Sequence, residues 1–311
     1  MGPILTLTLN PAVDMSARID QVIADRKLRC TDPRWDAGGG GVNVARVVHE
    51  LGGDVKALFL AGGATGAQLC ELLAQAGVPH EVVSIAGTTR EDVTILEETA
   101  GRLFRFVMPG PQVTEDECGR CIETLEAMLD DTTLVVASGS LPPGAPVDVY
   151  ARLARAARMR GARLFVDTSG AALVEAAKEP LFLLKCNLAE LSELTGRPIE
   201  GQGQLEDAAN ALVARGIEHV VISMGSAGAL LASRGQSQRR FPAITVRVVS
   251  KVGAGDSMLG GIVYSLATGS SMPEAVELGM ATGAAAVMAP GTQLCRREDV
   301  TRLRSALGIH Q

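Results

Sequence analysis

The chain alternates short apolar segments with stretches in which apolar side chains recur every three or four residues. Short runs rich in Val, Ile and Leu are typical of buried strands, whereas the longer spacing is typical of helices with one buried face. Because parallel strands require crossover helices, this alternation predicts an α/β sandwich, in which a mostly parallel sheet has helices on both faces. The expected strands are Ile4–Leu9, Val55–Ala61, Leu134–Ser138, Arg163–Asp167, Leu181–Lys185 and His219–Ser223.

Two stretches interrupt the alternation, because strand-like segments follow one another there without an intervening helix. Such strands cannot all join the parallel sheet, so we expect a small β-layer that stands off the main body. This predicts one α/β domain over residues 1–311, with a discontinuous β-layer from residues 12–37 and 80–108. The strand-like segments are Met15–Val22, Leu28–Asp36, His80–Ile85, Arg90–Glu97 and Arg102–Met108.

The charge balance excludes several classes of partner. The chain has 29 Lys and Arg against 35 Asp and Glu, a formal net charge of −6, and contains no basic run. Nucleic acid and anionic membranes are therefore not expected as main partners. Six scattered cysteines in a chain of this length require no disulfide framework, and no apolar stretch reaches the length of a membrane span. We therefore expect a cytoplasmic protein.

Four consecutive glycines, Gly38 to Gly41, lead directly into an expected helix at residues 42–52. Glycines allow positive φ and the close approach of a ligand to the main chain, and a helix N-terminus offers free N–H groups to an anion. Asn43 adds a side chain that can both donate and accept hydrogen bonds. A flexible connector is the alternative, but a glycine run that opens an amphipathic helix favours a binding loop.

A second glycine turn, Val252-Gly253-Ala254-Gly255-Asp256, opens the helical stretch Ser257–Ala267. The N–H groups of residues 253–256 are expected to point at one spot, where they would hold an anion without any side chain. A carboxylate beside such an anion hole is the arrangement that phosphoryl or acyl transfer needs. An ordinary Asp N-cap is an alternative of equal weight.

A third motif, Lys185-Cys186-Asn187-Leu188-Ala189-Glu190, lies where an expected strand ends and a helix begins. Asn187 and Glu190 have the spacing of a capping box. The functional alternative has Glu190 near Mg²⁺ through water, because that hard cation keeps several waters. All three motifs follow the carboxyl ends of strands, where open parallel sheets bind ligands.

Five motifs, in a consistent order from about residue 4 to residue 306, resemble the ribokinase-like PfkB family of carbohydrate kinases. They are LTLNPAVD at residues 7–14, GGGGVNVAR at 38–46, SGSLPPG at 138–144, Asn187-x-x-Glu190 and VGAGDSM at 252–258. Within the family, four further segments are most similar to the type II 6-phosphofructokinases: KLRCT at 27–31, AGGATG at 61–66, RFVMPG at 105–110 and GTQLC at 291–295.

This resemblance implies a ribokinase-like three-layer α/β/α sandwich whose small β-sheet acts as a lid and as the contact of a homodimer. It implies ATP-dependent phosphorylation of the 1-hydroxyl of fructose 6-phosphate to fructose 1,6-bisphosphate. Asp256 would be the general base, and Gly253, Ala254 and Gly255 would form the anion hole. The sugar would be bound by Asp14, Gly39, Gly40, Gly41, Asn43 and Ser140.

The resemblance also implies positions for ATP and for metal ions. Glu190 would help to position Mg²⁺ through water. The ATP side would be lined by Lys185, Asn187, Ser223, Gly225 and Gly228. Some members of the family hold a monovalent cation such as K⁺ in two loops that correspond here to Ser250, Val252, Ala286, Ala289, Gly291 and Gln293.

Three cations, Lys27, Arg90 and Arg105, lie in the segments expected to form the lid. Arg matches a phosphate through its planar fork and Lys as a point charge. A nucleoside kinase should instead present apolar and aromatic residues there, so these cations favour a phosphorylated sugar. Solvated charges at strand edges are the alternative.

Other functions stay open at this stage. A 1-phosphofructokinase or a tagatose-6-phosphate kinase fits the motifs less well. A catalytically silent protein that binds sugar or nucleotide as a regulator belongs to a different class, and the retention of Asp256 beside its glycine turn argues against it. An NAD-dependent dehydrogenase lacks its G-x-G-x-x-G fingerprint after a strand.

Overall fold

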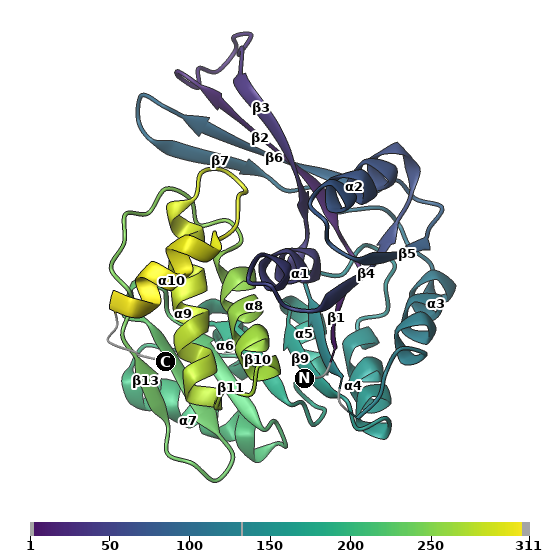
Figure 1. The fold of residues 1–311 in the computed structure, drawn as a ribbon, viewed down its shortest axis with the longest axis vertical. Helices are drawn as coiled ribbons and strands as arrows, with labels where there is room; N and C mark the ends of the chain where they lie inside the picture. Colours follow the sequence, from purple (N-terminus) through teal and green to yellow (C-terminus); the bar gives the residue numbers. More distant parts are fainter. Residues whose placement is uncertain (1–2, 132, 307–311) are drawn as a thin grey trace.

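The structure, a computed structural model, describes residues 3–131 and 133–306. Its large sheet has the strand order β13-β12-β11-β10-β9-β8-β1-β4-β5 (Figure 1). The strands from β5 to β11 are parallel, and β12 and β13 add an antiparallel edge. The strands are β1 (Ile4–Thr8), β4 (Val55–Ala61), β5 (His80–Ser84), β8 (Leu134–Ser138), β9 (Arg163–Asp167), β10 (Leu183–Asn187), β11 (His219–Ser223), β12 (Ala229–Ser233) and β13 (Arg239–Phe241).

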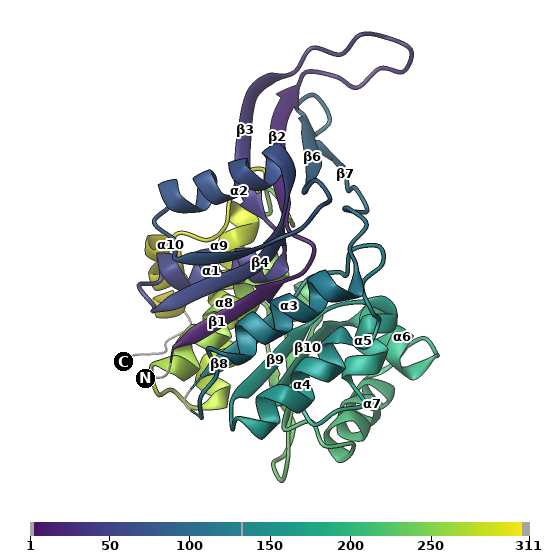
Figure 2. The same ribbon diagram turned by 90° about the vertical axis from the view of Figure 1, so that its right-hand side faces the viewer.

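Helices cover both faces of this sheet, which gives the predicted three layers (Figure 2). Successive residues of a strand face opposite layers: Val135 of β8 joins the core under α3 to α7, and Val136 joins the core under α1, α2, α8 and α9. The helices are α1 (Gly40–Glu50), α2 (Gly63–Gln75), α3 (Glu115–Glu126), α4 (Val149–Met159), α5 (Gly170–Ala176), α6 (Leu188–Thr195), α7 (Gln202–Ala214), the 3₁₀ turn η1 (Gly225–Ala227), α8 (Ala254–Ala267), α9 (Met272–Met288) and α10 (Arg297–Ala306).

A second sheet of four strands, in the order β3-β2-β6-β7, stands off the body and is called the lid below (Figures 1 and 2). Its strands β2 and β6 are parallel, whereas the outer pairs are antiparallel hairpins. The bounds are β2 (Ala12–Ile19), β3 (Thr31–Gly38), β6 (Arg90–Glu97) and β7 (Arg102–Phe106).

The expected lid boundaries need one correction. The segment at residues 80–85, predicted to belong to the lid, instead forms β5 and pairs in parallel with β4 at the edge of the large sheet. It directly follows α2, so β4, α2 and β5 make an ordinary crossover unit, and the chain enters the lid only afterwards. The second insertion therefore begins near residue 90 rather than at 80.

The large sheet changes winding direction at β1. β4 lies on one side of β1, and β8, which comes later in the chain, lies on the other. The strand order therefore proceeds outward from β1 in both directions. Open sheets of this type bind ligands in the crevice at that point, beyond the carboxyl ends of the strands. No helix within the described residues is long and apolar enough to cross a membrane.

Candidate functional site

The two glycine turns meet beside β1. The helix α1 begins at Gly40 and α8 begins at Ala254, and the two helices pack against each other. Asn43, in the first turn of α1, donates a hydrogen bond from Nδ2 to Oδ2 of Asp256 at 2.8 Å. Residues 213 positions apart in the chain are thus joined at one point.

The first turn needs glycine because two strands crowd it. A Cβ at Gly40 would lie 2.4 Å from Oγ of Ser138, and one at Gly41 would lie 2.6 Å from the carbonyl oxygen of Leu7. The loop is therefore wedged between the ends of β8 and β1. Its backbone can come this close only without side chains, so the first turn is a tightly packed segment and not a flexible connector.

The second turn carries free donors and a perturbed carboxylate. Gly253 has φ of 70°, which places it in the left-handed region before α8. The N–H of Ser257 bonds to the carbonyl of Gly253, so the N–H groups of residues 254–256 have no partner within the helix. Burial raises the pKa of Asp256 to about 6, the charge of Asp167 adds to this effect, and the hydrogen bond from Asn43 opposes it. Such a carboxylate can accept a proton near neutral pH.

A buried ion pair lies beneath the second turn. Nζ of Lys185 is 2.6 Å from Oδ2 of Asp167, and both side chains are at least nine-tenths buried. A Cβ on Gly255 would lie 3.0 Å from the same Nζ, so the ammonium group is directly beside the free N–H groups. Burial lowers the pKa of Lys185, but the charges of Asp167, Asp256 and Glu190 outweigh it and raise the pKa overall.

Asp167 was not among the residues predicted from the sequence. It is the last residue of β9, at the same sheet edge as the other motifs. A charged residue at the end of a buried strand, at the carboxyl edge of a parallel sheet, is the signal that could have found it.

The lid contributes a second carboxylate with an altered pKa. Asp14 of β2 is buried, and its Oδ2 would lie only 2.3 Å from a Cβ on Gly38, so it faces the first glycine turn. Burial and the nearby charge of Asp92 raise the pKa of Asp14 to about 6, while Arg105 lowers it. The charge of Arg105 also lowers the pKa of Asp256, so this guanidinium acts electrostatically on both carboxylates.

The three predicted lid cations differ in their surroundings. Arg105 is exposed on β7, and its side chain makes no hydrogen bond or ion pair within the described residues. Arg90 is engaged: it pairs with Asp92 and donates to the carbonyl oxygens of Met108 (2.8 Å) and Asn10 (3.1 Å). Lys27 lies on the loop between β2 and β3, and this loop extends from the ends of these strands away from the body (Figure 2).

Ser140 follows the end of β8 and is exposed; its Oγ is 3.4 Å from Nδ2 of Asn10. Gly39, with φ of 106°, precedes α1, and a Cβ at this position would lie 2.9 Å from Cα of Pro11.

A cavity of about 550 Å³ opens on the other side of the second turn. It is lined by three of the residues predicted to bind ATP, Ser223, Gly225 and Gly228, and by Ala254 and Gly255 of the second turn. Its far wall is formed by small and apolar residues of α8 and α9. The remaining wall residues are Ser226, Ala243, Ile244, Thr245, Val246, Val248, Lys251, Met258, Gly279, Met280, Gly283, Ala284 and Val287.

Asn187 and Glu190 form the capping box of α6 that their spacing predicted. Oδ1 of Asn187 accepts from the N–H groups of Ala189 and Glu190, and Oε2 of Glu190 accepts from the N–H of Asn187 at 2.8 Å. Burial, with Asp167 nearby, raises the pKa of Glu190. While it caps α6, the Glu190 carboxylate is still close enough to Lys185 for each charge to affect the pKa of the other group.

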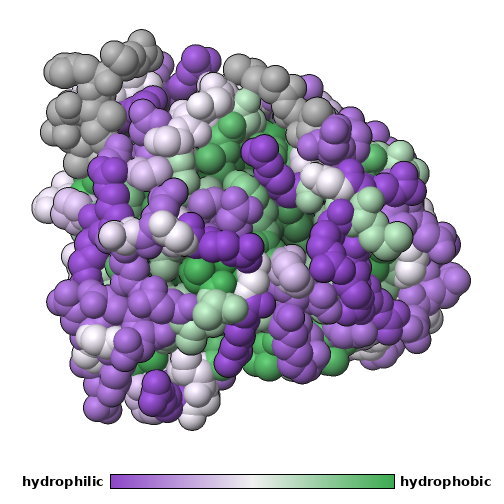
Figure 3. All heavy atoms as spheres, turned by 90° about the horizontal axis from the view of Figure 1, so that it is seen from below, coloured by the Kyte–Doolittle hydropathy of each residue, from purple (hydrophilic) through white to green (hydrophobic). Residues whose placement is uncertain are grey.

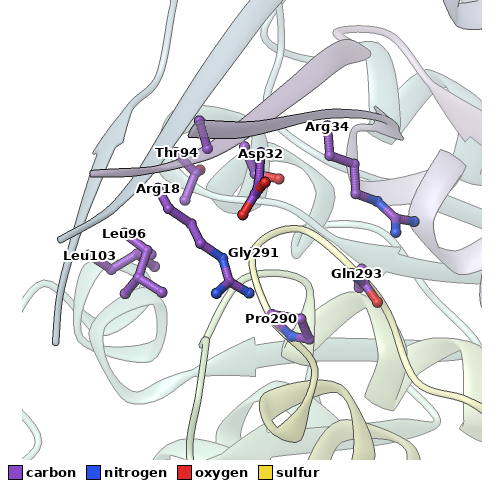
Figure 4. A pocket seen from close by; sticks show the side chains of 11 residues that line it. Arg18, Asp32, Arg34, Thr94, Leu96, Leu103, Pro290, Gly291 and Gln293 are labelled. Carbon is purple, nitrogen blue, oxygen red and sulfur yellow. The ribbon is translucent and has the colours of Figure 1, made fainter. Parts of the chain in front are cut away.

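The two loops predicted for a monovalent cation lie side by side. Oγ of Ser250 donates to the carbonyl oxygen of Gly291 at 2.7 Å and accepts from the N–H of Val252 at 3.2 Å. The carbonyl of Ala286 accepts from the N–H of Ala289. Gln293 and Gly291 also line a cavity of about 310 Å³ between this loop and the lid, into which Arg18 extends toward Gly291 (Figure 4).

Comparison with known proteins places this geometry in a family. The model of the pfkB family carbohydrate kinases matches residues 7–299. The chain belongs to this family. ATP-dependent 6-phosphofructokinase isozyme 2 of Mycobacterium tuberculosis strain H37Rv is 46% identical over 300 residues, which cover 96% of this chain and 88% of that protein. The protein of the same name from Escherichia coli K12 is 40% identical over 309 residues, 99% of both chains.

Solved structures agree with the sequence relatives. The crystal structure of phosphofructokinase-2 from Escherichia coli in complex with potassium superposes with a TM-score of 0.95 at 38% identity, and covers 99% of this chain and 100% of that one. The same enzyme in complex with fructose-6-phosphate gives a TM-score of 0.93. The family and the ribokinase-like fold predicted from the motifs are therefore confirmed.

Proposed function

We propose that the protein transfers the terminal phosphoryl group of ATP to the 1-hydroxyl of fructose 6-phosphate and forms fructose 1,6-bisphosphate. The observation that carries this proposal is the contact between Asn43 and Asp256, which places a carboxylate with a pKa of about 6 at the free N–H groups of a glycine turn. The relatives named ATP-dependent 6-phosphofructokinase isozyme 2 support the choice of substrate.

In this mechanism Asp256 accepts the proton of the 1-hydroxyl as the oxygen attacks the terminal phosphorus. A new oxygen–phosphorus bond forms, and the bond to the bridging oxygen breaks and leaves its electrons on ADP. The N–H groups of residues 254–256 and the ammonium of Lys185 would stabilise the negative charge on the transferred group. These donors are held by the helix and by the ion pair with Asp167, so they need little rearrangement during the reaction.

The sugar would lie in the crevice between the lid and the first glycine turn. Asp14, Asn43 and the backbone of Gly39 to Gly41 would bind its hydroxyl groups there, with Ser140 at the border. Arg105 is the cation best placed for the 6-phosphate, because it is unpaired and acts on both Asp14 and Asp256. Arg90 would act by holding the base of the lid, and Lys27 could reach a sugar only in the site of another subunit.

ATP would occupy the 550 Å³ cavity, with its base against α8 and α9 and its phosphates toward Gly255. Glu190 would position Mg²⁺ through water, since this cation is usually held by one or two carboxylates together with substrate phosphates. When bound, Mg²⁺ would neutralise charge on the phosphates. Backbone carbonyls of the loops at residues 250–252 and 286–293 would supply oxygen donors for K⁺, and the Escherichia coli relative has been crystallised with potassium.

The lid offers a surface for a homodimer. Large apolar side chains are exposed on and beside it: Ile23, Leu28, Trp35, Phe106, Val107 and Met108. The opposite end of the molecule presents mostly hydrophilic side chains, with apolar ones grouped toward its middle (Figure 3). Apolar groups on and beside an exposed sheet favour association through that sheet. A tetrameric inhibited form is described for the Escherichia coli relative, so pairs of dimers are compatible with this arrangement.

The proposed reaction belongs to glycolysis, and we place it in the cytoplasm, where the six free cysteines would remain reduced. The test is the release of ADP from MgATP with a panel of acceptors: fructose 6-phosphate, fructose 1-phosphate, tagatose 6-phosphate, ribose and adenosine. We expect the highest kcat/KM with fructose 6-phosphate. Preference for fructose 1-phosphate or tagatose 6-phosphate would replace the substrate, and turnover of none of them would favour a silent binding protein.

A further inference from the structure

The side-chain amide of Asn43 has a donor, its NH₂ group, and an acceptor, its oxygen. The proposed mechanism uses only the donor. Its Nδ2 donates to Asp256 at 2.8 Å. Its Oδ1 accepts from Nη1 of Arg46, one turn later on α1, at 3.3 Å. An amide turned over would bring its oxygen against the carboxylate and its NH₂ group against the guanidinium, so both contacts would become repulsive.

Arg46 is itself held firmly. Its side chain is 16% exposed, its Nη1 also donates to the carbonyl oxygen of Ala37, and its Nη2 lies 3.4 Å from Oδ1 of Asp36. Asp36 is buried and also accepts a hydrogen bond from Thr292 at 2.8 Å. A continuous polar chain therefore runs from the end of β3 through Arg46 and Asn43 to Asp256.

We propose that Arg46 is a positioning residue of the reaction, which keeps the NH₂ group of Asn43, and not its oxygen, directed at Asp256. This inference rests on the proposed function. Arg46 touches neither the carboxylate of Asp256 nor the N–H groups of the second turn, so its effect on the base passes through Asn43.

A neighbouring arginine provides the matched control. Arg34 pairs with both carboxylate oxygens of Asp36, at 3.0 Å each for Nε to Oδ2 and Nη2 to Oδ1, but makes no contact with Asn43. Its side chain is 53% exposed. If Arg46 mattered only as a counter-charge for Asp36, the removal of Arg34 would have a comparable effect. If Arg46 orients Asn43, only the removal of Arg46 alters the hydrogen bond that Asn43 donates to Asp256.

The first test compares Arg46→Met and Arg46→Lys with Arg34→Met. We expect kcat to fall roughly tenfold to hundredfold in Arg46→Met, since misplacement of a reacting group by about 1 Å has effects of this size. KM for ATP should change little. Arg46→Lys keeps a positive charge but cannot serve three acceptors in a plane, so its kcat should also fall, while Arg34→Met should retain the wild-type kcat. Equal losses in Arg34→Met and Arg46→Met would overturn the proposal.

A double-mutant cycle with Asn43→Ala tests the route of the effect. If Arg46 acts through Asn43, either Arg46 variant should change kcat by no more than about twofold in the Asn43→Ala background. Full additivity would show that Arg46 acts by another route. Arg46→Lys allows the cycle to be completed if Arg46→Met does not fold.

A measurement without turnover separates this inference from the proposed function. In protein labelled with ¹⁵N-Asn, the side-chain amide of Asn43, assigned by its loss in Asn43→Ala, should give one sharp pair of signals in the wild type and in Arg34→Met. In Arg46→Lys the pair should broaden or shift, because the amide can turn. An unchanged pair in Arg46→Lys would refute the role of Arg46, whether or not fructose 6-phosphate is a substrate. If the pair changes in Arg46→Lys but the wild type does not turn over fructose 6-phosphate, only the proposed function is refuted.

Discussion

The substitution Asp256→Asn tests the mechanism through both activity and stability. It removes the proton acceptor but keeps the size of the side chain and an oxygen that can accept from Asn43. A general base contributes about 10²- to 10⁴-fold to the rate, so kcat should fall by this factor. Because a base acts in the transition state, KM for the sugar phosphate should change much less.

The same substitution should stabilise the fold, and the size follows from the pKa. Folding raises the pKa of Asp256 from 3.8 to about 6. The folded protein therefore binds this proton more tightly than the unfolded chain, and the charged form carries a cost that is complete above pH 6 and absent below pH 3.8. At 1.36 kcal/mol per pH unit the cost is at most about 3 kcal/mol. The neutral amide avoids it.

Two assays check these expectations. Urea unfolding should show Asp256→Asn to be more stable than the wild type at pH 8, by about 1–3 kcal/mol, with the gain shrinking as the pH falls toward 4. The wild-type kcat/KM should decline below about pH 6 as Asp256 is protonated. A near-normal kcat in Asp256→Asn would show that this carboxylate is not the base. A variant less stable than the wild type at pH 8 would show that the carboxylate is not a destabilising buried charge.

Three further substitutions probe other parts of the site. Arg105→Ala should raise KM for fructose 6-phosphate roughly tenfold or more in steady-state assays, because a charge-assisted contact contributes about 1.5–3 kcal/mol. KM for ATP should stay nearly unchanged, and equal losses for both substrates would contradict the assignment of Arg105 to the 6-phosphate. Lys185→Met should lower the free energy of unfolding by about 3–5 kcal/mol in urea titrations, because it leaves the Asp167 charge buried and unpaired; adding Asp167→Asn should recover most of this loss, and no recovery would refute the pairing argument. Gly40→Ala should cost about 1–3 kcal/mol in thermal unfolding, because its Cβ would lie 2.4 Å from a side-chain oxygen of β8. Gly203→Ala in α7, which has open space around it, should be neutral or stabilising, and an equal loss there would refute the steric reason.

The central strands could be predicted from the sequence because they are buried on both faces, so their apolar residues form unbroken runs. Strand β4 has the predicted bounds of Val55–Ala61, and β10 is displaced only from 181–185 to Leu183–Asn187. The errors lie at the edges of the sheet. β5 has a mixed burial pattern that does not distinguish an edge strand of the body from a lid strand.

The glycine turns could be predicted as well. Only glycine fits where the backbone is crowded, so this requirement is visible in the sequence as a glycine run. The partners of the turns could not. Asp167 enters the site through an ion pair with Lys185, 18 residues away, and Arg46 enters through Asn43 and Asp36. The end of a strand marks Asp167 as a candidate, and Arg46 is one helical turn from Asn43, but the pairing of Asp167 with Lys185 and of Arg46 with Asp36 depends on how strands and helices are placed in space.

Two arginines together explain how a thin lid can be held precisely over a site. The lid joins the body through the ends of its strands. Arg46 binds the carbonyl oxygen of Ala37, at the end of β3, and Arg90 binds those of Asn10, before β2, and Met108, after β7. Both guanidiniums are largely buried and each also pairs with an aspartate of the lid. The base of the lid is therefore fixed by charge-assisted contacts to its own main chain, and these contacts hold the start of β2, which carries Asp14, beside the first glycine turn.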